Sequence, residues 1–153
     1  MISKDTGKSM IPNVAVVGAG YWGKNLVRNF HALNALGAIC DSDPERLESF
    51  KQQYPTAKIF NAYSDVLNDA TIRAVAIATP AEAHADAVRE ALLAGKDVFV
   101  EKPLCLSVEE GEGLVALAKK ESRILMVGHL LWYHPAVLKL KELIAAGELG
   151  RIQ

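Results

Sequence analysis

The chain has 153 residues and a formal net charge of −1, with half of its residues apolar and under a quarter charged. This length suits one domain with a core of its own, and the balanced charge gives no electrostatic reason to expect nucleic acid or an anionic membrane as a partner. No apolar run approaches the roughly 20 residues of a membrane span. Residues 1–11 lack the apolar segment of a signal peptide, and we expect them to form a loose polar tail.

The two cysteines, Cys40 and Cys105, are far apart and show no metal or redox spacing. We expect both to be small apolar fillers, which favours a reducing, cytoplasmic location. No cluster of Cys, His or Asp has the spacing of a metal site, so no metal is expected.

Strand-like and helix-like segments alternate along the first half of the chain. Leu26 and Phe30 recur at helical spacing, and we expect Gly37 to end that helix. Asp43-Pro44 suits the start of the next helix, because Asp caps helices and Pro favours the first helical position. The predicted elements are a strand at 14–17, a helix at 22–35, a strand at 38–40, a helix at 43–54, a strand at 58–60 and a short helix at 64–67 capped by Ser64.

The second half continues the alternation. Ser107 and Glu110 form a capping-box pair, and Gly95 and Gly147 are placed to end helices. The predicted elements are a strand at 74–78, a helix at 80–94, a strand at 98–100, a helix from 107 to 120, a strand at 124–127 and a helix at 135–146 with one apolar face formed by Val137, Leu140, Leu143 and Ile144. This order predicts an α/β fold, a doubly wound, mainly parallel six-stranded Rossmann sheet with helices on both faces.

A glycine-rich segment, Gly18-Ala-Gly20-Tyr-Trp-Gly23, follows the first strand and opens the first helix. Gly18 permits a tight turn, Gly20 lets a pyrophosphate approach the backbone, and Gly23 lets the helix pack on the strand. The helix N-terminus would offer N–H groups to the phosphates. An ordinary glycine-rich turn is the alternative. Tyr21 and Trp22 either cover the cofactor or simply pack.

Asp41 stands at the end of the second predicted strand, eighteen residues after Gly23. A carboxylate there accepts hydrogen bonds from the adenosine ribose and repels a 2′-phosphate, so we expect NAD rather than NADP, with Ser42 in the same site. Asp43 would add to this effect if it points inward, but a capping role is favoured. Arg46 is the residue that could instead meet a 2′-phosphate.

Two further signals follow later strands, where open α/β sheets bind ligands: Ala78-Thr79-Pro80 with His84, and Glu101-Lys102-Pro103. With GAGYWG, Asp41 and the pattern VGH…YHP…LKELI…GELGRI from 127 to 152, the sequence resembles the Gfo/Idh/MocA oxidoreductases, a family of sugar and cyclitol dehydrogenases, over residues 13–153.

The resemblance implies that Lys102 is catalytic, and the chemistry agrees: oxidation of a carbinol requires loss of the hydroxyl proton, which a lysine beside the nicotinamide can share. A surface lysine is the alternative. Thr79, Pro80, His84 and Glu101 are expected on the cofactor side, although a capping or surface role for His84 and a flanking role for Glu101 remain open.

The resemblance also implies a cis bond before Pro103. His129 and His134 either line the substrate side or are structural, the second being more common for lone histidines. The stretches GYWGKNLVRNF and GHLLWYHPAV look like the nucleotide-sugar 3-dehydrogenases, which act on UDP-N-acetylhexosaminuronic acid. Trp132 departs from the polar residue, often arginine, that many relatives have there.

The family carries a second α/β domain that binds substrate and forms oligomers. We therefore expect residues 12–149 to be the dinucleotide-binding domain and 150–153 the start of a truncated substrate domain. The chain alone should bind dinucleotide but turn over little substrate, and its parent should be a homo-oligomer acting on a small sugar or nucleotide sugar. The alternatives are an NAD-dependent glycosidase of the same family and a non-catalytic NAD-sensing module.

Overall fold

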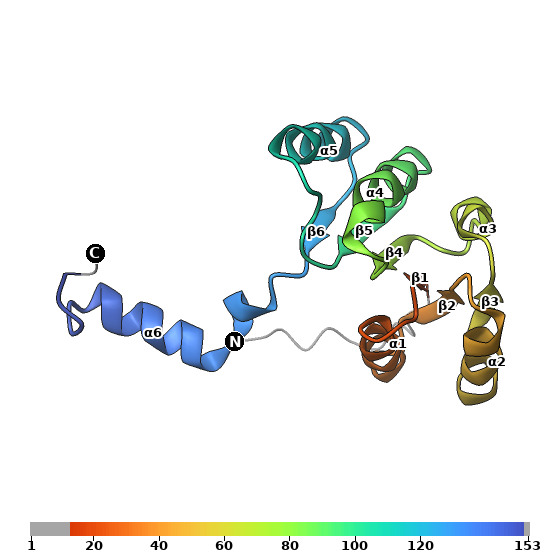
Figure 1. Ribbon diagram of the computed structural model, residues 1–153, viewed down its shortest axis with the longest axis horizontal. Helices are drawn as coiled ribbons and strands as arrows, with labels where there is room; N and C mark the ends of the chain where they lie inside the picture. Colours follow the sequence, from red (N-terminus) through yellow and green to blue (C-terminus); the bar gives the residue numbers. More distant parts are fainter. Residues whose placement is uncertain (1–12, 152–153) are drawn as a thin grey trace, which may run out of the picture.

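The computed structural model describes residues 13–151. Six strands form one sheet in the order β3-β2-β1-β4-β5-β6, with every neighbouring pair parallel (Figure 1). This arrangement confirms the predicted doubly wound sheet. From β1 the chain adds strands first toward one edge of the sheet, as β2 and β3, and then toward the other edge, as β4, β5 and β6. Such sheets form a crevice at the carboxyl ends of the two strands where this order reverses, here β1 and β4. The strands are β1 (Val14–Val17), β2 (Leu36–Cys40), β3 (Lys58–Phe60), β4 (Ala74–Ile77), β5 (Asp97–Val100) and β6 (Leu125–Val127).

The helices connect these strands and cover the sheet on both sides. Figure 1 shows α1 and α2 on one side and α4 and α5 on the other. The α-helices are α1 (Gly23–Ala32), α2 (Pro44–Gln53), α3 (Tyr63–Asn68), α4 (His84–Leu93), α5 (Val108–Lys120) and α6 (Pro135–Ala145), and two 3₁₀ turns are η1 (Ala81–Ala83) and η2 (Leu130–Tyr133).

The sheet separates two apolar cores. Alternation along β1 sends Ala15 and Val17 into the core that includes Leu92 of α4, and Val16 into the core that includes Val27 of α1. All five side chains are buried, and each fully buried valine or leucine contributes about 1.5–3 kcal/mol. The central strands are apolar throughout because both of their faces are covered.

The prediction that Gly37 ends the first helix is wrong. The helix α1 ends at Ala32, and Gly37 lies inside β2, which begins at Leu36. Asn34 makes the turn with φ of 55°, and its N–H donates to the His31 carbonyl at 2.9 Å. Asparagine tolerates this left-handed conformation, so a glycine is not needed to end the helix.

Two predicted helix starts are also wrong. Ser64 does not cap α3, because the helix begins one residue earlier at Tyr63, after Ala62, and has no side-chain cap. The helix predicted from Pro80 begins with the tight turn η1, so that α4 itself starts at His84.

The other capping predictions are confirmed. Asp43 accepts hydrogen bonds from the backbone N–H groups of Glu45 and Arg46 at 3.0 and 3.1 Å, which is the capping role favoured from sequence. Ser107 accepts one from the Glu110 N–H at 3.1 Å, which is the Ser107 half of the predicted capping box, whereas the Glu110 carboxylate accepts from the Ser107 hydroxyl at 3.3 Å. Gly95 and Gly147 follow α4 and α6 with φ of 72° and 74°.

The helix α6 stands apart from the sheet (Figure 1). On its predicted apolar face Val137 and Leu143 are half-buried, whereas Leu140 and Ile144 are exposed. None of its residues is buried, so sheet coverage comes from the other helices. The predicted tail at 1–11 lies outside the described residues, and of the segment 150–153 only Gly150 and Arg151 are described, neither in a strand.

Candidate dinucleotide-binding site

The glycine-rich loop connects β1 to α1, as predicted. Gly18 has φ of 83°, and a Cβ placed there would lie 2.9 Å from the backbone of Ala78. A Cβ on Gly23 would lie 1.8 Å from the Gly18 carbonyl oxygen, whereas a Cβ on Gly20 would have no described atom within 4 Å. The loop is therefore tight at Gly18, packed at Gly23 and open at Gly20, where a ligand can approach the backbone.

The N-terminus of α1 faces this loop. Its N-cap residue, Trp22, makes no side-chain capping bond, and the first turn contains no acidic residue. The Lys24 and Asn25 N–H groups of this turn donate to the carbonyl oxygens of Gly20 and Trp22 at 3.1 and 2.9 Å, and no side chain caps the end of the helix. This uncapped end, with the helix dipole, suits a phosphate group.

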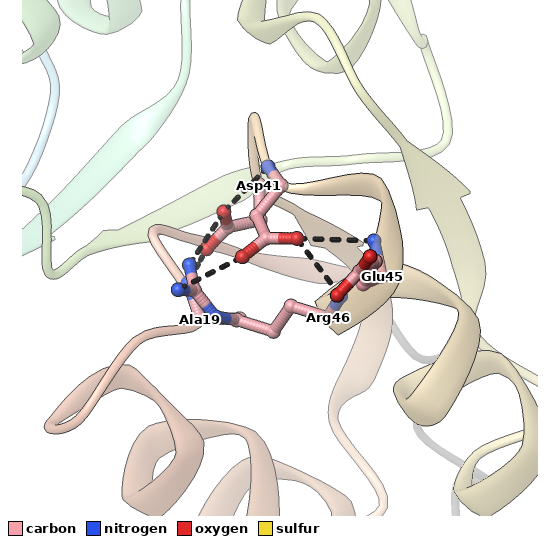
Figure 2. A network of polar contacts seen from close by, with 5 residues as sticks. Ala19, Asp41, Glu45 and Arg46 are labelled. Atoms are coloured by element: carbon pink, nitrogen blue, oxygen red, sulfur yellow. Dashed lines mark hydrogen bonds and ion pairs between the residues drawn. The ribbon is translucent and has the colours of Figure 1, made fainter.

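Asp41 follows β2, and its carboxylate takes part in the network in Figure 2, with a side chain that is only 5% exposed. Oδ2 accepts the Ala19 N–H at 2.7 Å, and Oδ1 accepts both the Asp43 N–H at 2.9 Å and the Arg46 guanidinium at 2.8 Å. Burial alone would raise the pKa of this carboxyl, but the Asp43 N–H, the Arg46 side chain and the Ala19 N–H together hold it below its ordinary value. Asp41 is therefore ionised at neutral pH.

Arg46 modifies the electrostatics of this corner. Its guanidinium also pairs with the Asp43 carboxylate at 3.2 Å, and its side chain is 40% exposed. The negative charge of Asp41 is thus partly balanced by a cation at the mouth of the site. Asp41 therefore repels a 2′-phosphate less strongly than it would without Arg46.

A cleft of about 600 Å³ runs along the carboxyl ends of β1, β2 and β4. It brings together eight of the residues predicted to bind cofactor, which are Gly18, Gly20, Tyr21, Trp22, Asp41, Ser42, Thr79 and Pro80. Gly23 lies beneath the loop and packs against Gly18 instead of lining the cleft.

Sequence reasoning did not predict that Asn61 and Tyr63 belong to this cleft. They follow β3, so their place after a predicted strand was the signal available. The Tyr63 hydroxyl donates to the Ala87 carbonyl at 2.7 Å. Cys40 also lines the cleft, and burial raises the pKa of its thiol to about 11, so it remains protonated and apolar.

Glu101 and Lys102 follow β5 and lie beside this cleft. The Glu101 carboxylate is buried and accepts a hydrogen bond from the Trp22 indole N–H at 2.5 Å. This contact ties the glycine-rich loop to the Glu101-Lys102-Pro103 segment. Lys102 is exposed, and the Lys102–Pro103 peptide bond is cis, as the resemblance implies.

A second cleft, of about 670 Å³, shares Trp22 with the first. It is lined by Glu101 and Lys102 and by the segment 128–132, including His129 and Trp132. His134 instead caps α6 by accepting the Ala136 N–H at 3.2 Å, which is a structural role.

His84 is only 2% exposed, so it is not a surface histidine. Together with Thr79, Glu101 and Lys102 it lines a cavity of about 350 Å³ between the ends of β4 and β5. Within residues 13–151 there is no group of His, Cys, Asp or Glu side chains that could hold a metal ion. None of the helices in this part of the chain is long and apolar enough to cross a membrane.

A parallel sheet of this strand order, with a glycine loop at its first helix and an acidic residue after its second strand, defines a dinucleotide-binding domain of the Rossmann type. The model of the Gfo/Idh/MocA group, described as an oxidoreductase family with an NAD-binding Rossmann fold, matches residues 12–129. The chain belongs to this family.

Several relatives support this assignment. The scyllo-inositol 2-dehydrogenase (NAD(+)) of Bacillus subtilis is 36% identical over 143 residues, which are 90% of this chain and 41% of that protein. The structure of scyllo-inositol dehydrogenase from Lactobacillus casei, with bound NAD(H) and scyllo-inositol, matches with a TM-score of 0.83 and 27% identity, over 92% of this chain and 42% of that one. UDP-N-acetylglucosamine 3-dehydrogenase from Acidithiobacillus ferrooxidans gives 0.77 and 28%, over 85% and 42%. The chain thus spans about two fifths of the length of these relatives.

Proposed function

We propose that this chain is the cofactor-binding domain of an NAD-dependent dehydrogenase that oxidises a secondary alcohol of a sugar, cyclitol or nucleotide sugar. One observation carries this proposal: the glycine-rich loop, Asp41 and Lys102 meet at one edge of the sheet, and the Trp22–Glu101 hydrogen bond joins their two clefts. Inositol and nucleotide-sugar dehydrogenases among the relatives support the substrate class.

The residues of the cleft fit a dinucleotide. Gly20 is open to solvent where a pyrophosphate would approach, and the N-terminus of α1 lies beside it. The Asp41 carboxylate has acceptor capacity left on Oδ2, which receives one hydrogen bond and can receive a ribose hydroxyl as well. Thr79, Pro80 and the neighbouring Glu101 continue the site toward the nicotinamide end.

Bound NAD supplies the hydride acceptor, and we assign transfer of the substrate's hydroxyl proton to Lys102. Its side-chain nitrogen, at the border of two clefts, hydrogen-bonds the substrate hydroxyl and, as the neutral amine, accepts the proton that leaves as the carbonyl forms. Glu101, held by Trp22, keeps this segment in place.

The proposal extends to the domain boundaries, the oligomeric state and the cellular location of the protein. Residues 12–149 form the dinucleotide-binding domain, residues 150–153 lead into a substrate domain, and the parent enzyme is a homo-oligomer with a small-molecule substrate. The length of the relatives supports a second domain. Two free cysteines support a cytoplasmic setting.

A titration of this chain with NADH and NADPH, followed by reduced-nicotinamide fluorescence, tests the proposal. We expect tighter binding of NADH, and a loss of about tenfold or more in Asp41→Ala, because a hydrogen bond to a charged group is removed. Glu48→Ala, at an exposed position of α2, is the matched control. Arg46→Ala should widen the preference for NADH by leaving Asp41 without its cation. Preference for NADPH, or binding of neither nucleotide, would refute this assignment.

A further inference from the structure

His84 contacts two separate segments of the site through its imidazole ring. It is the first residue of α4, and both of its ring nitrogens meet backbone carbonyl oxygens. Nδ1 lies 2.6 Å from the oxygen of Pro103, and Nε2 lies 2.8 Å from the oxygen of Thr79. The ring therefore spans the gap between the segment after β4 and the segment after β5.

Both partners of this ring are acceptors. A neutral imidazole carries one N–H donor and one lone pair, so it could satisfy only one of the two carbonyls and would direct a lone pair at the other. The bridge is complete only when both ring nitrogens carry a hydrogen. Hydrogen bonds from such a ring are charge-assisted and about twice as strong as neutral ones.

The charges around His84 act in both directions. The N-terminus of α4 and the Lys102 ammonium oppose a second proton on the ring, whereas Glu101, which lines the same cavity, favours it. The acidic Glu82 and Asp86, beside His84 in η1 and α4, are exposed and more strongly screened. The two carbonyl oxygens at 2.6 and 2.8 Å are the closest groups, and they favour the doubly protonated ring.

We propose that His84 is a positioning residue, whose ring holds the Lys102-Pro103 segment against Thr79 through two simultaneous N–H bonds. Lys102 precedes the residue whose carbonyl is bound, so the bridge fixes where its side chain emerges between the two clefts. The catalytic part of this role rests on the function proposed above, whereas the bridge itself does not depend on any cofactor.

The bridge also orients Thr79. The hydroxyl oxygen of Thr79 is buried and has no hydrogen-bond partner within the described residues 13–151. Thr79 lines both the 600 Å³ cleft and the cavity beside His84. Because His84 holds the Thr79 carbonyl, the Thr79 hydroxyl stays available for a ligand where the cleft meets the cavity.

The first test needs no cofactor. Nitrogen-15 NMR of the 153-residue chain at neutral pH should show that both His84 ring nitrogens bear hydrogen, each with a one-bond N–H coupling. A His84 ring with one lone-pair nitrogen would overturn the bridge. If the wild-type chain binds neither NADH nor NADPH, the proposed function fails, and the NMR result still decides on His84.

The second test asks whether the bridge positions Lys102. Acylation of Lys102 by an amine-reactive ester is followed by mass spectrometry, with and without NADH, in wild type, His84→Leu, His84→Gln and the control His31→Leu. In wild type and the control, NADH should slow acylation of Lys102 but not of the exposed Lys120.

In His84→Leu we expect this shielding to fall by about tenfold, as loss of a charge-assisted hydrogen bond implies, with a much smaller change in NADH affinity. His84→Gln, which retains an N–H donor, should recover part of the shielding, and it serves as the informative variant if His84→Leu does not fold. Full shielding of Lys102 in a folded His84 variant would refute the positioning role.

Discussion

At the scale of single residues, two glycines of the loop have different roles. Gly23 is closed by packing, since a methyl group there would lie 1.8 Å from a backbone oxygen. Gly20 is open, since a methyl group there would meet no described atom within 4 Å. One glycine therefore serves the fold and the other is free to serve a ligand.

This contrast predicts opposite phenotypes for two similar substitutions. Gly23→Ala should lower the free energy of unfolding by at least about 1–3 kcal/mol, the usual cost of overpacking, because the backbone must shift. Gly20→Ala should leave it within about 0.5 kcal/mol, as for other unobstructed surface positions, and should weaken NADH binding by filling the approach to the backbone. Urea unfolding and the NADH titration measure the two effects. Equal loss of stability in both variants would contradict this division.

At the scale of elements, the turn that follows α3 is held by lysine side chains from β3 and from the start of β5, two strands that are not adjacent in the sheet. Asp69 accepts hydrogen bonds from the Lys58 ammonium of β3 at 2.6 Å and from the Thr71 hydroxyl at 2.7 Å. Lys96, just before β5, donates to the carbonyls of Asp69 and Ile72 at 2.8 and 2.7 Å. The amino-terminal edge of the sheet is thus fastened by polar contacts, far from the clefts at its carboxyl edge.

Asp69 predicts a pH dependence of stability. The hydrogen bond from Lys58, followed by those from Thr71, lowers the pKa of this carboxyl to about 2, below its ordinary value of 3.8. A lowered folded-state pKa gives stability that is fully present above pH 3.8 and is lost as the pH falls toward 2. Asp69→Asn should therefore be less stable than wild type at pH 7, and urea unfolding should show the difference shrinking between these two pH values. The exposed Glu48→Gln is the control, and a difference that does not change with pH would count against the ion pair.

At the scale of the whole molecule, the two cores and α6 are separate. Both cores are formed by the sheet with α1 to α5, whereas α6 contributes no buried residue. Its exposed Leu138, Leu140 and Ile144 lie on a helix that stands away from the sheet (Figure 1). Folding of the sheet should therefore be independent of this helix.

A stop after His134 tests this independence. We expect the shortened chain to keep the free energy of unfolding of the 153-residue chain within about 1 kcal/mol, since side chains that remain exposed add little on folding. Its NADH affinity should be unchanged, because the 600 Å³ cleft contains no residue of α6. Thermal unfolding by circular dichroism and the fluorescence titration provide the measurements. A large loss of stability would mean that α6 packs on the sheet in solution.

Local pattern was enough to predict most elements of this fold. The strand at 14–17 and the cap at Asp43 follow from adjacent residues, because apolar runs and capping side chains act within a few positions of the chain. The wrong predictions concern the ends of helices, where several neighbouring residues could form the same turn. Asn34 took the left-handed position that was expected to need Gly37, and a one-residue shift placed Ser64 inside α3.

The sequence by itself determined the fold class, the order of the elements and the family of this protein, since these depend on periodicity and on motifs that are contiguous in the chain. Only the tertiary structure decided which groups meet. The Trp22–Glu101 hydrogen bond joins residues that are 79 positions apart, and the ring of His84 bridges Thr79 and Pro103. Neither contact leaves a local signal, because the crossovers of the parallel sheet bring distant segments to one edge, and side-chain hydrogen bonds across that edge depend on distances that no one-dimensional pattern records.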